Sequence, residues 1–172
     1  MHIDQPNPQT IRRRATTRRT LGVAATVIVI AIGWSLFRPE LLFISHRVNE
    51  PFPLTATQPL SQGRFHGVAH ATAGLATLYQ LPDGKRALRL TEFETSNGPD
   101  VQVYLVATKD ATDNETVTKA GFIHLGALKG SVGNQNYEVS ADVDLTRYQA
   151  VTIWCRRFGV NFGTAPLAEQ HS

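Results

Sequence analysis

The most reactive side chain in the sequence belongs to its single cysteine, Cys155. Cys155 ends the apolar run 150–155 and directly precedes two arginines. In a β-strand, Cys155 and Ile153 point to one face, whereas Trp154 and Arg156 point to the other. The thiolate is the nucleophilic and redox-active form of cysteine, and a guanidinium beside an exposed sulfur favours that form. The run therefore predicts a strand that carries a candidate redox residue.

Three roles for Cys155 remain open on the sequence alone. The first is that of a small buried hydrophobe among β-branched neighbours. The second is that of a redox group or ligand, and the third is that of one half of an intermolecular disulfide. A single cysteine cannot form a disulfide within its own chain. Alternation places Arg156 on the opposite face, so only Arg157, a twist or a bulge would bring a cation to the sulfur.

The histidines give little support for a metal centre. His66 and His70 are four residues apart, a spacing that separates them by about 13 Å on a strand. A blue-copper site is disfavoured because no histidine follows Cys155 before His171, and the only methionine is Met1. The sequence therefore gives no set of metal-ligating residues.

A cofactor is harder to exclude. The absence of Cys-x-x-Cys-His excludes covalent c-type haem. Non-covalent haem needs an axial histidine and an apolar slot, so it stays open, as does a bound metal. His70 and Trp154 are the candidate cofactor-binding residues. In extended geometry Trp154 shares a face with Phe158 and Phe162, which indicates a sandwich core or a ligand slot.

Other polar residues do not form a catalytic pattern. Asp142 and Asp144, with Glu138 nearby, lack the spacing of a calcium loop. Glu92 and Glu94 alternate on a strand, but nothing else indicates a sugar cleft. We therefore expect an electron-transfer or binding module rather than a turnover enzyme.

The positive charge is concentrated at the N-terminus. Five arginines and one aspartate give residues 1–20 a net charge of +4. Ten Lys/Arg and eleven Asp/Glu give residues 63–172 a net charge of −1. The main domain thus lacks the basic surface of a nucleic-acid-binding protein.

Residues Leu21–Phe37 carry no charge and predict one transmembrane helix of about 25 Å. The arginines on its N-terminal side place residues 1–20 in the cytoplasm and the rest of the chain outside it, in a periplasm, a lumen or at the cell surface. A cleaved signal peptide is the alternative, but its apolar region would be shorter and no A-x-A-like site follows. The stretch 17–23 only loosely resembles a twin-arginine signal.

The remaining sequence divides into a tether and a domain. Four prolines interrupt residues 38–62, which predicts an extended, semi-rigid tether. From residue 63 to 168, short alternating runs are separated by turn signals, and a four-residue tail, 169–172, follows. The predicted strands cover 64–70, 76–81, 87–94, 101–108, 122–128, 136–140, 150–155 and 158–162, and 108–121 is a polar loop. This pattern favours an all-β fold, an antiparallel β-sandwich.

Several blocks resemble the electron-transfer DM13 domain family over residues 63–167. The most specific pieces are Asn97-Gly98-Pro99-Asp100, Leu125-Gly126-x-Leu128-Lys129-Gly130, Gln135-Asn136-Tyr137 and Ile153-Trp154-Cys155. The resemblance implies an extracytoplasmic β-sandwich found near haem- or sugar-binding domains. It also implies a redox role for the cysteine that aligns with Cys155.

Two functions are therefore expected. The first is a membrane-anchored electron-transfer module that acts through Cys155 with an unknown redox partner. The second is a non-enzymatic ligand- or protein-binding module with a merely buried cysteine. An unpaired thiol outside the cytoplasm favours the first, because structural cysteines there usually occur in pairs.

Overall fold

A computed structural model describes residues 22–33, 35, 45–52 and 58–169. The chain divides into two compact units, Met1–Glu40 and Leu41–Ser172. In the first unit, residues 22–33 are helical, whereas the tail 1–20 and Leu21, Trp34 and Phe37 of the predicted span lie outside the described residues. Among the described residues, no helix combines the length and apolar character that crossing a bilayer requires.

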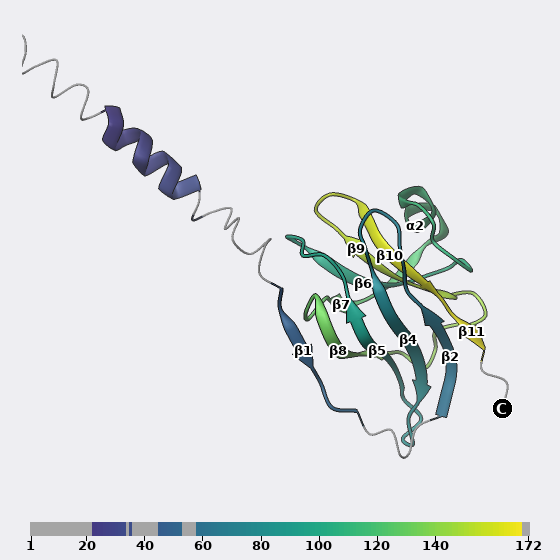
Figure 1. The fold of residues 1–172 in the computed structure, drawn as a ribbon. Coiled ribbons are helices and arrows are strands. Elements are labelled where there is room, and N and C mark those ends of the chain that lie inside the picture. Colours follow the sequence, from purple (N-terminus) through teal and green to yellow (C-terminus); the bar gives the residue numbers. More distant parts are fainter. Residues whose placement is uncertain (1–21, 34, 36–44, 53–57, 170–172) are drawn as a thin grey trace, which may run out of the picture. The chain divides into compact units, whose positions relative to one another are not determined.

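The second unit is a sandwich of two β-sheets, which confirms the all-β prediction (Figure 1). Within the described residues, one sheet has the strand order β1-β8-β5-β4-β2-β11. Its strands are β1 (Arg47–Asn49), β2 (Gln58–Arg64), β4 (Ala73–Gln80), β5 (Arg86–Glu94), β8 (Val132–Val139) and β11 (Ala168–Glu169). All of its pairs are antiparallel except that of β1 with β8, which is parallel.

The other sheet has the order β3-β10-β9-β6-β7, with antiparallel pairing throughout the described residues. Its strands are β3 (His66–Gly67), β6 (Val101–Val106), β7 (Phe122–Ala127), β9 (Ala150–Cys155) and β10 (Val160–Pro166). The central strands β6 and β9 are buried at every position. Such continuous burial indicates that both faces of this sheet are covered.

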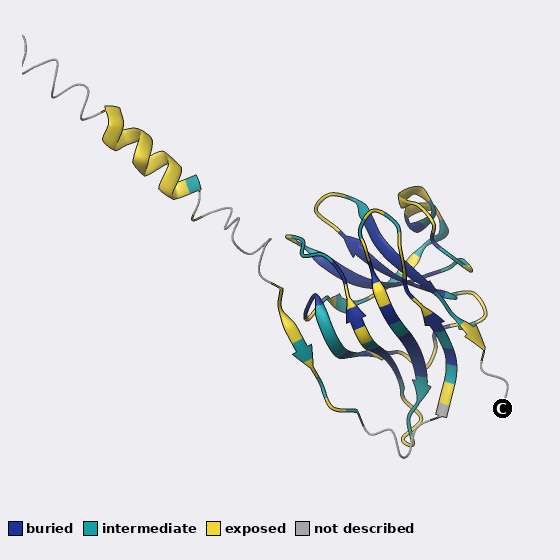
Figure 2. Ribbon diagram, in the orientation of Figure 1, coloured by how far each residue is buried: buried dark blue, intermediate teal, exposed yellow. Residues whose placement is uncertain are grey.

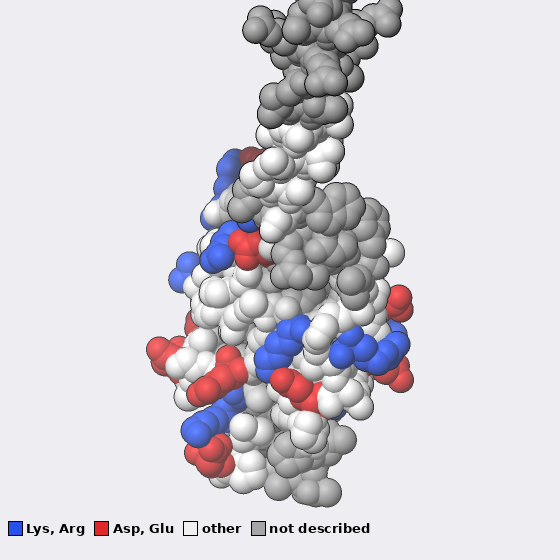
Figure 3. Space-filling view, turned by 90° about the vertical axis from the view of Figure 1, so that its left-hand side faces the viewer, with Lys and Arg blue, Asp and Glu red and all other residues white. Residues whose placement is uncertain are grey.

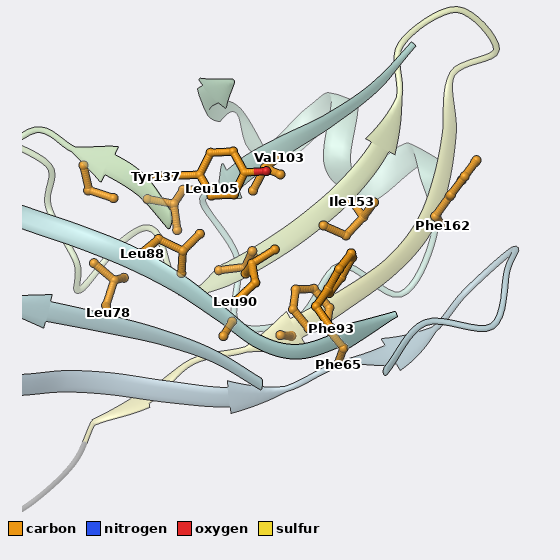
Figure 4. Close-up of a cluster of buried hydrophobic side chains, with 14 of the residues drawn as sticks. Phe65, Leu78, Leu88, Leu90, Phe93, Val103, Leu105, Tyr137, Ile153 and Phe162 are labelled. Atoms are coloured by element: carbon orange, nitrogen blue, oxygen red, sulfur yellow. The ribbon is translucent and has the colours of Figure 1, made fainter. Parts of the chain in front are cut away.

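The main core lies between the two sheets (Figures 2 and 4). Phe93 from β5 packs edge-on against Phe65 with ring centroids 5.2 Å apart. Aliphatic side chains from facing strands fill the rest, among them Leu78, Leu88, Leu90, Val103, Leu105 and Ile153. Burial of these side chains is the main source of stability of the sandwich.

The segment predicted as a tether contributes to the sheet instead. Residues 47–49 form β1, and β2 begins at residue 58, inside the predicted tether of 38–62. Proline disfavours helices but is tolerated in edge strands and at bulges. Here β1 is an edge strand, and the register of β2 shifts between Pro59 and Ser61. The proline pattern therefore excluded a helix but did not distinguish a tether from edge strands.

The polar loop predicted for residues 108–121 contains a short helix, α2 (Asn114–Ala120). Asp113 caps its N-terminus by accepting a hydrogen bond from Thr116 N at 2.6 Å. Lys119 pairs with Glu115 one turn earlier. Buried Val117 packs in a second apolar cluster with Tyr104, Val106, Ala111, Ala150 and Trp154. The helix thus helps to cover the face of the β6–β9 sheet that points away from the main core.

Candidate functional site

Cys155 is the last residue of β9, and its side chain is 0% exposed. It lies in the core between the sheets with Val151 and Ile153 of the same strand. Trp154 lies in the separate cluster on the opposite face. The alternation predicted from the sequence is therefore confirmed, and the sulfur has an apolar environment.

The strand partners of Cys155 are Val101 of β6 and Val160 of β10. Arg156 begins the turn that follows β9, and its Nε donates to Asp100 Oδ2 at 2.9 Å. The backbone N of Arg156 also donates to the carbonyl of Asp100 at 2.9 Å. The hydrogen bond from this guanidinium holds the pKa of the Asp100 carboxyl below its usual value. Arg156 therefore ties β9 to the beginning of β6.

The turn of residues 97–100 packs tightly against the core. A Cβ on Gly98 would lie 2.7 Å from Val101 Cγ2 and 3.0 Å from Phe162 Cζ. Such distances are shorter than ordinary van der Waals contacts, so a larger residue would displace the turn. Gly98 is required by this close approach.

A second loop, residues 128–131, is anchored by the buried side chain of Gln135. Its Oε1 accepts hydrogen bonds from Lys129 N at 3.1 Å, Gly130 N at 3.3 Å and the Tyr137 hydroxyl at 2.8 Å. Its Nε2 donates to the Gly130 carbonyl at 2.7 Å. Burial raises the pKa of Tyr137, so its hydroxyl stays protonated and can donate. The buried amide of Gln135 thus holds the loop of residues 128–131 in place.

These two loops form a pocket of about 300 Å³. Its lining comprises His46, residues 96–102 and residues 127–131. Leu128 N donates to the Val101 carbonyl at 2.9 Å, which joins the two walls. The four sequence blocks singled out for their motifs therefore converge at one end of the sandwich. Cys155 does not line the pocket, but its strand partner Val101 does.

The two candidate cofactor-binding residues do not join Cys155 in one site. The ring of His70 packs against Phe162 with centroids 4.0 Å apart, and Trp154 lies on the opposite face of β9. Phe158 is 67% exposed in the β9–β10 turn, so Trp154, Phe158 and Phe162 do not share a face. The turn at 156–159 breaks the extended geometry that the prediction assumed. This arrangement does not fit an axial haem ligand beside an apolar slot.

Two other histidines, His66 and His124, bind neighbouring polar groups. His66 Nε2 lies 3.0 Å from Asp110 Oδ2, and His124 Nε2 lies 2.7 Å from the Gln102 side-chain oxygen. In the described part of the chain, no three His, Cys, Asp or Glu side chains are placed to hold a metal ion. Figure 3 shows acidic and basic side chains interspersed over a largely uncharged face.

Two polar residues important for the pocket were missed from the sequence. Gln135 precedes the strand predicted at residues 136–140, yet it lies inside β8 and is 0% exposed. Glu50 lies in the predicted tether, yet Lys129 Nζ donates to its carboxylate at 2.8 Å. Only the polar run 134–136 beside Gly133 gave a signal, since alternation would turn its middle residue inward.

Comparison with known families gives one match. A family model described as Electron transfer DM13 matches residues 64–167. Neither the curated proteins nor the solved structures yield a significant match.

Proposed function

Because the chain belongs to the electron transfer DM13 family, we propose that it is a membrane-anchored, extracytoplasmic electron-transfer module with Cys155 as its redox residue. The family description supplies the electron-transfer role in general terms. We propose three further properties: a membrane anchor, a location outside the cytoplasm and a redox role for Cys155.

The anchor is supported by the first unit of the chain. The apolar side chains of the helix at residues 22–33 are exposed, among them Val23, Ile28 and Ile30, with 57–66% exposure. A helix that is apolar on all sides requires an apolar environment, as a bilayer provides. The arginines at residues 12–19 favour a cytoplasmic N-terminus, and this orientation puts the sandwich on the opposite side of the membrane.

The convergence of the motif blocks on the end of β9 is the observation that carries the redox role. Val101 is at once a wall of the pocket and the strand partner of Cys155. A partner that enters this pocket would contact Val101, which lies one strand spacing, about 5 Å, from the cysteine backbone. Displacement of the two loops would give it access to the sulfur.

Thiol–disulfide exchange is the chemistry that a lone cysteine can perform without a cofactor. The Cys155 thiol loses its proton to solvent, and the thiolate attacks one sulfur of a partner's disulfide. A bond forms between the two sulfurs while the partner's disulfide bond breaks, and the second partner sulfur leaves as a thiolate. A thiolate of a dithiol donor then attacks the partner's sulfur in the mixed disulfide and releases the Cys155 thiolate. The donor's second thiolate displaces the partner as a dithiol, so the donor is oxidised to a disulfide and the partner's disulfide is reduced.

A ligand- or protein-binding domain is the second candidate. It is favoured by the full burial of Cys155 together with a pocket on the surface above it. In that case the cysteine acts only as a small apolar side chain, and the pocket binds its ligand without a change in the sulfur.

The full chain in detergent micelles distinguishes the two candidates. We expect the folded protein to release one equivalent of coloured thiolate from an aromatic disulfide reagent, and a Cys155→Ala variant to release none. Release only after denaturation would support the binding domain and contradict the redox role. An absorption spectrum and metal analysis of the same sample test for a bound chromophore or ion.

A further inference from the structure

Residues 46–52, named the strap here, lie along the edge of β8 outside the residues that match the family model. Its central part is β1, which pairs with residues 132–134 in parallel. Glu50 N continues this pairing by donating to the Asn134 carbonyl at 2.9 Å. The strap thus adds an edge strand to a sheet that is otherwise antiparallel.

Two glycines within the family match accommodate the strap. Gly133 has a φ of +109°, and a Cβ there would lie 2.0 Å from the carbonyl oxygen of Val48. A Cβ on Gly130 would lie 2.6 Å from the carbonyl oxygen of His46. Side chains at either position would displace the strap, so this edge is shaped to receive it.

The carboxylate of Glu50 is the main polar anchor of the strap. Its two oxygens accept hydrogen bonds from Lys129 Nζ at 2.8 and 2.9 Å, and Oε2 also accepts from Asn136 N at 2.8 Å. Arg89 Nη1 donates to the Glu50 carbonyl at 3.2 Å. Lys129 Nζ reaches the Asn136 carbonyl as well, at 2.7 Å. Charge-assisted bonds of this kind are stronger than neutral ones.

The strap buries little apolar surface. Val48 is half-buried and its neighbours Arg47 and Asn49 are exposed. Phe52, which is also half-buried, contacts Tyr79 with ring centroids 4.9 Å apart. Segments with few buried apolar contacts open at a lower free energy than the core, so the strap can separate while the sandwich stays folded.

A continuous set of contacts connects the strap to Cys155. His46 lines the pocket, and Glu50 binds Lys129 in the loop of residues 128–131. The neighbouring Leu128 donates to the carbonyl of Val101, the strand partner of Cys155. Release of the strap removes His46 from the lining of the pocket and removes the charged anchor of this loop.

We propose that the strap is a releasable cover that controls access to Cys155. When it is bound, the loop of residues 128–131 is fixed over the end of β6 and the thiol is closed off. When it separates, the loop keeps its bonds to Gln135 and Val101 but loses those to the strap, so it opens more often and reagents or a partner's disulfide reach the sulfur. The use of the thiol rests on the proposed redox function, but the control of access does not.

The test measures two rates on the full chain in detergent micelles. One is the modification of Cys155 by a maleimide, followed by mass spectrometry without denaturant. The other is hydrogen exchange of the Asn136 amide, which donates to Glu50 and so reports on strap release. Glu50→Gln is nearly isosteric and removes the charge. Gly133→Ala introduces the Cβ that has no room.

We expect both rates to rise up to about fivefold in Glu50→Gln, since its charge-assisted bonds are weakened, and more in Gly133→Ala. Glu138→Gln, the same change at an exposed position of β8, leaves both rates unchanged. Thermal unfolding identifies any variant that is globally unfolded, and Glu50→Gln is expected to retain the fold.

Faster exchange of Asn136 without faster modification of Cys155 would show that the strap opens but does not cover the thiol, and would overturn the proposal. Unchanged rates in both variants would overturn it as well. If modification accelerates as expected but Cys155 exchanges with no disulfide, the cover stands and the redox function fails. The two proposals are thus tested separately.

Discussion

The interior around Cys155 and the strap both contact the loop of residues 128–131, yet different forces stabilise them. The interior consists of apolar side chains that are almost fully removed from water, such as Ile153 and Phe93. The strap depends on the Glu50 carboxylate, one lysine and backbone pairing. Apolar burial stabilises the whole sandwich, whereas a few polar bonds at an edge can be lost locally.

This difference shows how one domain can bury a thiol and still allow access to it. Full burial in the core alone would limit reaction of Cys155 to rare global unfolding. An edge segment with weak apolar contacts offers a lower-energy opening close to the same residue. Variants that change local opening of the strap without changing global unfolding, or the reverse, therefore distinguish the forces that stabilise the two regions.

The largest effect is expected from Ile153→Ala, which removes buried methyl groups beside Cys155 on the same strand face. The free energy of unfolding should fall by about 2–5 kcal/mol, because the cavity cannot collapse fully. Chemical denaturation measures this loss. Exchange of the Asn136 amide through local opening should not change, since the strap contacts remain. A loss below about 0.5 kcal/mol would contradict the assigned core.

A smaller effect is expected from acid, acting on Glu50. Burial alone would raise its pKa, but hydrogen bonds from Lys129 and the Asn136 amide, with the nearby charge of Arg89, outweigh this and lower it below 4.5. A lowered pKa means that the carboxylate stabilises the folded strap above about pH 4.5 and that this contribution is lost as the pH falls through the folded-state pKa.

The measurement is the difference in unfolding free energy between the wild type and Glu50→Gln. It should be about 1 kcal/mol or less at pH 7 and should approach zero once the pH has fallen below the folded-state pKa of Glu50. Glu138→Gln provides the control, with no difference at either pH. A Glu50 difference that persists unchanged in acid would show that the carboxylate charge does not fix the strap.

The features that the sequence predicted correctly depend on local patterns. Alternation in 150–155 predicted the faces of β9, including the inward direction of Cys155 and the outward direction of Trp154. The short apolar runs likewise predicted most strands. In the polar segment 108–121, the cap at Asp113 and the Glu115–Lys119 spacing were available signals of a helix, but seven residues were too few for an apolar period.

The candidate site was less predictable because it depends on contacts far apart in the sequence. Nothing local indicates that Glu50 binds Lys129, or that the amide of Gln135 fixes a loop five residues earlier. The positive φ of Gly133 is required only by the approach of Val48 from another segment. The edge strand β1 in the proline-rich segment likewise depends on pairing with β8, which no local pattern indicates.

An equilibrium redox titration shows whether Cys155 of the folded chain takes part in thiol–disulfide exchange. The full chain, folded in detergent micelles, is incubated in glutathione buffers of graded potential, and the fraction of Cys155 joined to glutathione is measured by mass. We predict a reversible transition that is the same from the oxidised and reduced sides and absent in Cys155→Ala. A thiol that stays unmodified at every potential while folded, yet reacts once denatured, would contradict this prediction.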